Sequence, residues 1–250
     1  MTLPLAFAAC VLVAADAQTV TVGSVSLKVD GVTSTNARRN GNLLEPVTIE
    51  GPGFKLQLEP GPIVWFSNGT LVGTLAAETS LKLGDREYPL AAHQRVELEL
   101  LPSARVAGAM LARPTAIEHR DLGPAVAKGY VTFRDAGPEH FTYAEPATLG
   151  SGPIKLSVPA GAFARRWNAH TELGSKEPLS ATVRGMTLQP KTALVRAGPQ
   201  VFTLFTSETI SAGGKQYAVS EVVDFNGFVT VKTRDGELAL DDKGGLKRRR

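Results

Sequence analysis

The chain has 250 residues, of which 43% are hydrophobic, 20% charged and 6% aromatic, a composition typical of a globular protein with a sizeable core. It excludes wholesale disorder, a collagen-like chain and a multipass membrane protein. Its 25 glycines and 16 prolines amount to about one residue in six, which favours many short elements over a few long helices.

The small net charge of +3 is concentrated at the C-terminus, where Lys247, Arg248, Arg249 and Arg250 alone supply four positive charges. The rest of the chain is therefore close to neutral. A nucleic-acid-binding protein needs a basic face with interleaved aromatic residues, so we predict no such function. We interpret the terminal cluster either as a contact with an anionic surface, such as lipid or lipopolysaccharide, or as a solvated terminus.

Residues 1–17 have the features of a signal peptide. Their apolar stretch spans 13 residues from Leu3 to Ala15, fewer than the roughly 20 that cross a bilayer. Ala15, Asp16 and Ala17 fit the A-x-A pattern of a cleavage site, so we predict cleavage before Gln18 and export to a bacterial periplasm or cell surface. No Lys or Arg precedes the stretch, which is unusual for a signal, and the alternative is an apolar strand or buried helix that stays on the chain.

Cys10, the single cysteine, follows Phe7-Ala8-Ala9. This segment resembles the lipobox of bacterial lipoproteins, although Phe7 stands where that family prefers Leu, so lipidation at Cys10 is an alternative to removal. Removal of residues 1–17 would leave no cysteine, which excludes disulfides, thiolate catalysis and cysteine metal sites from the mature chain.

From Gln18 onward, short segments rich in β-branched and aromatic residues predict strands, and several alternate apolar and polar residues with a period of two. These segments are 20–29, 54–58, 95–100, 130–133 and 228–231. Between them lie dipeptides that favour tight hairpin turns, namely Asn40-Gly41, Asn68-Gly69, Asn226-Gly227 and Asp235-Gly236. The best helical candidate, 162–169, is only about two turns long. We therefore predict an all-β fold with little or no helix after the signal segment.

A seven-residue pattern recurs, with an apolar residue first, threonine fifth or sixth and an apolar residue last. It occurs at 43–49, 75–81, 111–117, 143–149, 188–194 and 204–210. The intervals between starts are 32, 36, 32, 45 and 16 residues, which indicates a repeat of about 33 residues that drifts near the C-terminus.

Residues 63–98, IVWFSNGTLVGTLAAETSLKLGDREYPLAAHQRVEL, are similar to a repeat of exported bacterial proteins. That repeat has a V-x-F strand, N-G-x-L, then G-x-L-A-x-x-T-x-I, a glycine, a proline and another V-x-F strand. The resemblance covers about half of the mature chain and implies antiparallel hairpins in an elongated sheet or β-solenoid, without an assigned activity.

We predict five segments along the chain: the signal peptide at 1–17, a β-hairpin repeat region at 18–160, an irregular segment at 161–187, C-terminal hairpin repeats at 188–243 and a basic tail at 244–250. The irregular segment contains Arg165, Arg166 and Trp167 among few strand-like residues. Together with Trp65, these three residues are the candidate binding residues, because exposed aromatic and arginine side chains commonly anchor partners.

Motifs that would carry catalysis are missing from the sequence. The four histidines have no metal-binding spacing, no G-x-S-x-G motif is present, and the glycine pairs at 51 and 53 and at 150 and 152 lead into strands. We predict no catalytic residue, metal or cofactor.

The predicted function is a non-enzymatic scaffold or binding protein of the bacterial envelope, whose partner is an envelope polymer, a lipid or a protein. The first alternative is a periplasmic protein that handles lipid or lipopolysaccharide, and the second is a hydrolase acting on glycan. Self-association through the sheet edges is a further expectation.

Overall fold

The structure, a computed structural model, describes residues 16–134, 137–150, 152–196, 201–212, 214–243 and 245–248. Strands account for 68% of the described residues, which contain no helix, and this confirms the predicted all-β class. In particular, nothing in the described ranges forms a helix long and apolar enough to cross a membrane.

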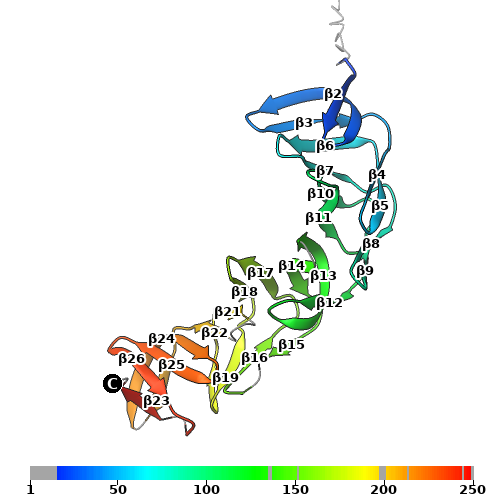
Figure 1. Ribbon diagram of the computed structural model, residues 1–250. Coiled ribbons are helices and arrows are strands. Elements are labelled where there is room, and N and C mark those ends of the chain that lie inside the picture. Colours follow the sequence, from blue (N-terminus) through cyan, green and yellow to red (C-terminus); the bar gives the residue numbers. More distant parts are fainter. Residues whose placement is uncertain are drawn as a thin grey trace, which may run out of the picture.

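One long antiparallel sheet runs from end to end of the molecule (Figure 1). Each strand is hydrogen-bonded to the next in the following order: β2 (Val25–Thr35), β3 (Arg38–Leu43), β6 (Gly61–Phe66), β7 (Thr70–Thr74), β10 (Arg95–Glu99), β11 (Arg105–Met110), β13 (Gly123–Arg134), β14 (Gly137–Tyr143), β17 (Phe163–Trp167), β18 (His170–Gly174), β21 (Thr192–Arg196), β22 (Val201–Phe205), β24 (Lys215–Phe225), β25 (Phe228–Thr233), β26 (Gly236–Leu240) and β27 (Leu246–Arg248).

Short hairpins form a second layer over one face of this long sheet. They are β1 (Gln18–Val22) with the start of β2, β4 (Val47–Gly51) with β5 (Phe54–Leu58), β8 (Thr79–Leu83) with β9 (Arg86–Leu90), β12 (Thr115–His119) with the start of β13, β15 (Ala147–Leu149) with β16 (Ile154–Val158), β19 (Ser180–Val183) with β20 (Met186–Leu188), and β23 (Thr209–Ala212) with the start of β24. In Figure 1 the molecule is an elongated arc, with hairpins such as β4–β5 and β8–β9 on its convex side.

The core lies between the two layers and is continuous from Val22 to Leu240. Alternation along each strand builds it. In β5, for example, Phe54, Leu56 and Leu58 are buried while Lys55 and Gln57 are exposed. Because each unit buries its apolar face only against its neighbours, the fold is a stack of repeats.

The recurring pattern marks the place where the chain leaves the long sheet for the next short hairpin. In five of the six occurrences of the seven-residue pattern, its first residue lies at or near the end of a long-sheet strand. Both the first and the last residue of these five segments are buried. These residues are Leu43 and Ile49, Leu75 and Leu81, Leu111 and Ile117, Tyr143 and Leu149, and Leu204 and Ile210.

The window at 188–194 is the exception and was wrongly assigned. It begins in β20 and runs into the long sheet, where Leu194 is half-buried. The equivalent unit lies at 175–181, between β18 and β19, and ends at the buried Ala181. The sequence pattern did not reveal this unit, because Ser175 stands where the pattern has an apolar residue and Ser180 stands where it has threonine. With units starting at 43, 75, 111, 143, 175 and 204, the intervals are 32, 36, 32, 32 and 29 residues. The repeat length is therefore nearly constant up to the C-terminal units.

A backbone hydrogen bond recurs in four of the six units. In these units the second residue of the seven-residue pattern donates its N–H to the carbonyl of the fourth residue of the strand that closes the preceding short hairpin. The pairs are Leu44 N to Lys28 O at 2.9 Å, Ala76 N to Gln57 O at 2.8 Å, Ala112 N to Pro89 O at 2.9 Å, and Ala144 N to Val126 O at 2.8 Å.

Other expectations need correction. The segment 161–187 is not irregular, because it forms β17, β18, β19 and part of β20. Its core positions are filled by small residues such as Ala162, Ala164 and Ala181, which do not have the β-branched character expected of strands.

Asn40-Gly41 is not a turn but lies inside β3, where a side chain on Gly41 would come within 3.4 Å of the Trp65 indole. The three other dipeptides lie at hairpin turns as predicted. The basic tail begins as a strand, since β27 pairs with β26. The predicted signal peptide up to residue 15, including Cys10, and Arg249 and Arg250 at the other end lie outside the described residues.

Candidate functional site

Trp65 is buried, with only 3% of its surface exposed, so its prediction as an exposed binding anchor is wrong. It lies on β6 with its side chain in the core, because residues 63 and 65 of this strand face the short hairpins and residues 64 and 66 face away. A tryptophan in a V-x-F strand of this repeat is therefore a packing residue.

Arg165 and Arg166 lie on β17 and, being adjacent on a strand, point to opposite faces. Arg165 faces away from the short hairpins and binds Glu172 of β18, with its Nη2 atom 2.5 Å from Glu172 Oε2. Trp167 closes the β17–β18 hairpin opposite His170, and its side chain lies outside the described part of the chain. The three residues are brought together on one strand but do not form one surface.

Arg166 is instead part of an inward polar network, which corrects its prediction as a surface contact. Its guanidinium lies 3.3 Å from Asp121 Oδ2 and 3.7 Å from Glu139 Oε1. Thr171, which is fully buried, donates its hydroxyl to Asp121 Oδ2 at 2.7 Å. The network ties the β12–β13 turn to the β17–β18 hairpin.

His119 completes this region as a buried, hydrogen-bonded side chain. It is 2% exposed, its Nδ1 atom accepts a hydrogen bond from Asp121 N at 3.2 Å, and it makes a backbone hydrogen bond with Glu139. Burial lowers its pKa below the ordinary value of 6.5, against the opposing effect of Asp121. Because the ring is buried and hydrogen-bonded within the fold, the geometry favours a structural role.

A cavity of about 490 Å³ opens beside this network. Its lining includes Arg86 and Glu118, which form an ion pair at 3.1 Å, together with Arg120, Arg134 and Glu139. Basic and acidic groups therefore alternate around it, and its charges largely compensate one another.

The feature that the sequence analysis missed is a set of exposed aromatic residues on the face of the long sheet turned away from the short hairpins. We call this surface the open face and define it by four phenylalanines on β17, β22, β24 and β25. They are Phe163, Phe205, Phe225 and Phe228, with exposed fractions of 41%, 36%, 50% and 51%. The two other exposed large hydrophobic residues within the described ranges are Leu44 and Leu101.

The strand register places these rings in two rows. Phe163 and Phe205 share a cross-strand row through Gly174 and Thr192, three strand spacings or about 14 Å apart. The ring of Phe163 covers Gly174, and a side chain there would collide with it. Phe225 and Phe228 form a direct pair that closes the β24–β25 hairpin. The rings are therefore separated anchors and not one continuous apolar strip.

Polar groups surround the anchors and are mutually paired. The row between the two phenylalanine rows contains Arg165 and Glu172, and Lys232 lies 3.7 Å from Glu221 on β24. Asp224 points to the opposite, core-facing side of β24, and its burial raises the pKa of its carboxyl group although the backbone N–H of Gly227 donates to it at 2.7 Å.

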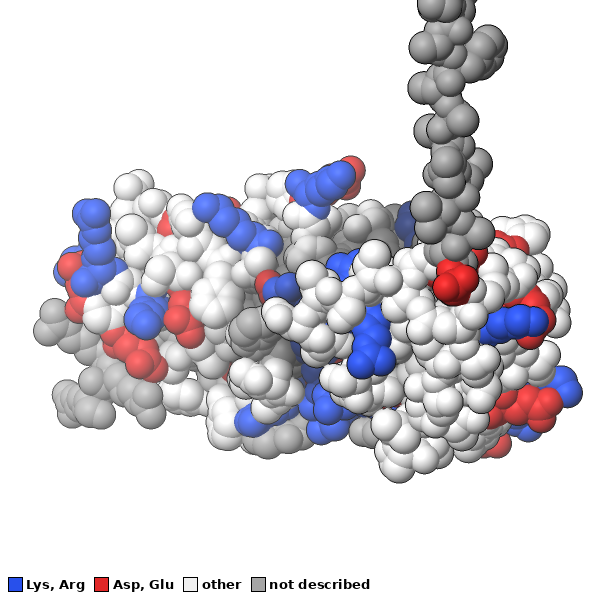
Figure 2. Space-filling model, turned by 90° about the horizontal axis from the view of Figure 1, so that it is seen from above, with Lys and Arg blue, Asp and Glu red and all other residues white. Residues whose placement is uncertain are grey.

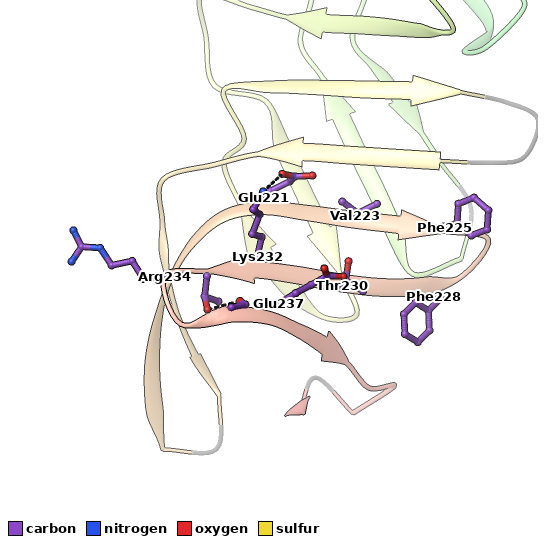
Figure 3. A pocket seen from close by; sticks show the side chains of 10 residues that line it. Glu221, Val223, Phe225, Phe228, Thr230, Lys232, Arg234 and Glu237 are labelled. Atoms are coloured by element: carbon purple, nitrogen blue, oxygen red, sulfur yellow. Dashed lines mark hydrogen bonds and ion pairs between the residues drawn. The ribbon is translucent and has the colours of Figure 1, made fainter. Parts of the chain in front are cut away.

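A groove of about 510 Å³ crosses the open face over β24, β25 and β26 (Figure 3). Phe225 and Phe228 lie beside the turn at one end, Val223 and Thr230 lie in the middle, and Lys232, Arg234, Glu221 and Glu237 lie toward the other end. The groove is therefore amphipathic, apolar at the hairpin turn and charged at the opposite end.

A sequence signal for this surface does exist. In residues 222–225 of β24, Val-Val-Asp-Phe, both faces of the strand carry apolar residues, and a phenylalanine flanks each side of the Asn226-Gly227 turn. A strand that exposes one face to solvent normally carries polar residues on that face, and phenylalanine there is unexpected.

Of the basic cluster, Lys247 lies 3.2 Å from Asp241, so its charge is partly compensated within the fold. The side chain of Arg248 lies outside the described part, as do Arg249 and Arg250. In Figure 2 acidic and basic side chains lie beside one another at both ends of the molecule, and mostly basic ones occupy the middle of the visible face.

Within the described residues, His, Cys, Asp and Glu side chains form no group of three or more that could hold a metal ion. No protein-family model, curated protein or solved structure matches the chain.

Proposed function

We propose that this protein is a non-enzymatic binding scaffold of the bacterial envelope, whose open face docks an extended segment of a protein partner. The observation that carries the proposal is the placement of four exposed phenylalanines on one face of a single sheet. Phe225 and Phe228 form an exposed cross-strand pair, and phenylalanine is one of the aromatic residues that are enriched in protein interfaces.

The surroundings of the rings favour a protein over a lipid or a glycan as the main partner. The ion pair Arg165–Glu172 lies in the row between the two phenylalanine rows, and the ion pair Lys232–Glu221 lies beside Phe205 in its row. Aromatic anchors within a polar rim are typical of protein interfaces, whereas an acyl chain needs a continuous apolar path. Glycan recognition would favour Trp and Tyr, whose N–H or O–H group can form a hydrogen bond in addition to the ring contact.

The repeat architecture suits this role because it holds the anchors at fixed spacing. The rings come from β17, β22 and the β24–β25 hairpin, which are joined by an uninterrupted hydrogen-bonded ladder. A rigid, preorganised surface spends little entropy on ordering its side of the interface. The predicted export signal supports an envelope location.

The test compares three variants, Phe205→Ser, Phe225→Ser and Phe228→Ser, with the wild-type protein. Envelope partners retained by the wild-type protein are identified, and the leading one is purified and titrated by isothermal calorimetry. Each substitution should weaken binding at least about tenfold while far-UV circular dichroism stays unchanged.

Leu101→Ser is the matched control, because Leu101 is 50% exposed but lies in the β10–β11 loop, away from the phenylalanine rows. Equal loss of binding in this control, or full binding by all three phenylalanine variants, would contradict the proposal.

The groove over β24–β26 favours a second candidate, a site for a single amphiphile such as a fatty acid or lysophospholipid. Its phenylalanine end would contact the acyl chain, and Lys232 and Arg234 would face an anionic head group. Native mass spectrometry of protein purified without harsh detergent tests this idea. One lipid per chain, absent from Phe225→Ser, would support it, and a ligand-free mass would exclude it.

A further inference from the structure

Among the described residues, β1 forms a sheet edge at the N-terminal end of the fold. It pairs with β2, and no other strand pairing of the described residues involves it. Its sequence, Gln-Thr-Val-Thr-Val, contains no charge, proline or glycine. Natural proteins usually shield edge strands with lysine, proline, a bulge or a very short length, and β1 has none of these.

The hairpin register shows which backbone groups of β1 are free. Val22 and Val25 close a two-residue turn at Gly23-Ser24, so they form a hydrogen-bonded pair. Alternation along the ladder then directs the N–H and C=O groups of Val20 toward β2 and those of Thr19 and Thr21 away from it. Thr19 and Thr21 are also exposed.

The edge strand at the C-terminal end of the long sheet is protected. This strand, β27, has only three residues, and Lys247 and Arg248 are two of them. Two copies meeting at this edge would bring like charges together, and a β1 edge offers them no acidic partner. The β1 and β27 edges therefore differ, and of these two only β1 is suited to strand addition.

We propose that β1 pairs in antiparallel orientation with β1 of a second copy of this chain, centred on Val20, to form a two-fold dimer. Thr19 then lies opposite Thr21 of the second copy, and each such pair exchanges both of its backbone hydrogen bonds. The Thr-Val-Thr sequence is symmetric about Val20, so the same side chains meet on both sides of the axis.

A second copy fits this edge better than an unrelated chain. An isologous contact needs a self-complementary surface, and an uncharged threonine-rich strand provides one, because cross-strand threonine pairs are favourable and no charges conflict. Because the C-terminal edge is shielded, the association ends at two copies and does not extend into a fibre. The proposal is independent of the open face, which lies on other strands.

Sedimentation equilibrium of the full chain tests the dimer. The mass should rise from that of one chain, 26.4 kDa, toward twice that value as concentration increases from about 1 to about 200 µM, the range expected for a small interface. The double variant Thr19→Lys and Thr21→Lys places lysines opposite each other and should raise the dissociation constant at least tenfold.

The matched control is Thr48→Lys with Gln57→Lys, which adds the same charges to an exposed cross-strand pair of the β4–β5 hairpin. It should leave the dimer intact. A wild-type protein that stays at the mass of one chain throughout, or a β1 variant that dimerises as the wild type does, would overturn the proposal.

A cysteine experiment tests the register directly. In a Cys10→Ser background, Val20→Cys places two cysteines at the two-fold axis in a non-hydrogen-bonded pair, whose Cα separation permits a disulfide. A dimer band that disappears on reduction is expected. Thr19→Cys is the control, since Thr19 faces Thr21 and not its own copy. Cross-linking of Thr19→Cys, or none of Val20→Cys, would contradict the proposed register.

Discussion

Arg166 Nη1 lies 3.3 Å from Asp121 Oδ2 across 45 residues of sequence. The Asp121 side chain is 3% exposed and that of Arg166 is 17% exposed, so the pair is largely withdrawn from water. It joins the turn of one short hairpin to the long sheet of the next unit. Neighbouring units are thus held together by a specific polar contact in addition to the shared apolar core.

Asp121→Asn should destabilise the protein by about 3 kcal/mol, because it leaves the Arg166 guanidinium inside the fold without its main counter-charge. Urea unfolding followed by circular dichroism measures the effect. Glu118→Gln is the control, since its ion pair with Arg86 is about half exposed on both sides and should be worth less than about 1 kcal/mol. Equal effects of the two substitutions would contradict the assigned role.

Tyr143→Phe should stabilise the protein by about 1 kcal/mol, contrary to the usual effect of a core substitution. The hydroxyl of Tyr143 is buried without a hydrogen-bond partner among the described residues, and burial raises its pKa well above 10.0. Removing it removes an uncompensated desolvation penalty while the ring keeps its packing against Phe141 at 4.9 Å. The midpoint of urea unfolding should rise.

Tyr130→Phe is a suitable comparison, because the Tyr130 hydroxyl lies 3.5 Å from Glu97 Oε2 and has a partner to lose. That substitution should leave stability unchanged or lower it slightly. A loss of stability in Tyr143→Phe similar to that of a typical core variant would show that its hydroxyl is satisfied.

Stability should fall as the pH is lowered below 6.5. Burial depresses the pKa of His119 in the folded state, so the unfolded chain binds a proton first as the pH falls. The contribution of His119 is complete above the unfolded pKa of about 6.5 and is lost between that value and the depressed pKa, at about 1.4 kcal/mol for each unit between them.

His119→Gln keeps a donor and an acceptor at this position but cannot titrate. Unfolding free energies of this variant at pH 7.5, 6.5 and 5.5 should vary less than those of the wild-type protein. An unchanged slope in His119→Gln would assign the pH dependence to other groups.

Gly53→Ala should cost at least about 2 kcal/mol, since Gly53 has a φ of 79° and approaches the backbone of Lys82 in the next short hairpin. Its carbonyl accepts the Lys82 N–H at 2.8 Å. Gly84→Ala is the matched control, with a φ of 59° but open space around it, and should cost about 1 kcal/mol. The difference between the two losses of stability measures the steric effect of the close approach between Gly53 and Lys82.

Much of the architecture follows from local sequence. Alternating segments such as FKLQL at 54–58 become strands because only that register buries Phe54, Leu56 and Leu58 together. The repeat is visible because every unit must turn from one layer to the other with a buried residue at each end of the turn. Where small residues replace branched ones, as at Ala164 and Ala181, the same strands form from contacts with neighbouring units and the local pattern is lost.

The candidate site depended on tertiary structure. Strand alternation is local, but which of the two faces the next layer covers is set by neighbouring units. The packing of the second layer on one face buries Trp65 and directs Arg166 to Asp121. The same packing leaves Phe205 and Phe225 exposed to solvent. Composition and local pattern thus determined the strands and the repeat, whereas the packing of units decided which aromatic residues became core and which became surface, because burial depends on residues distant in the sequence.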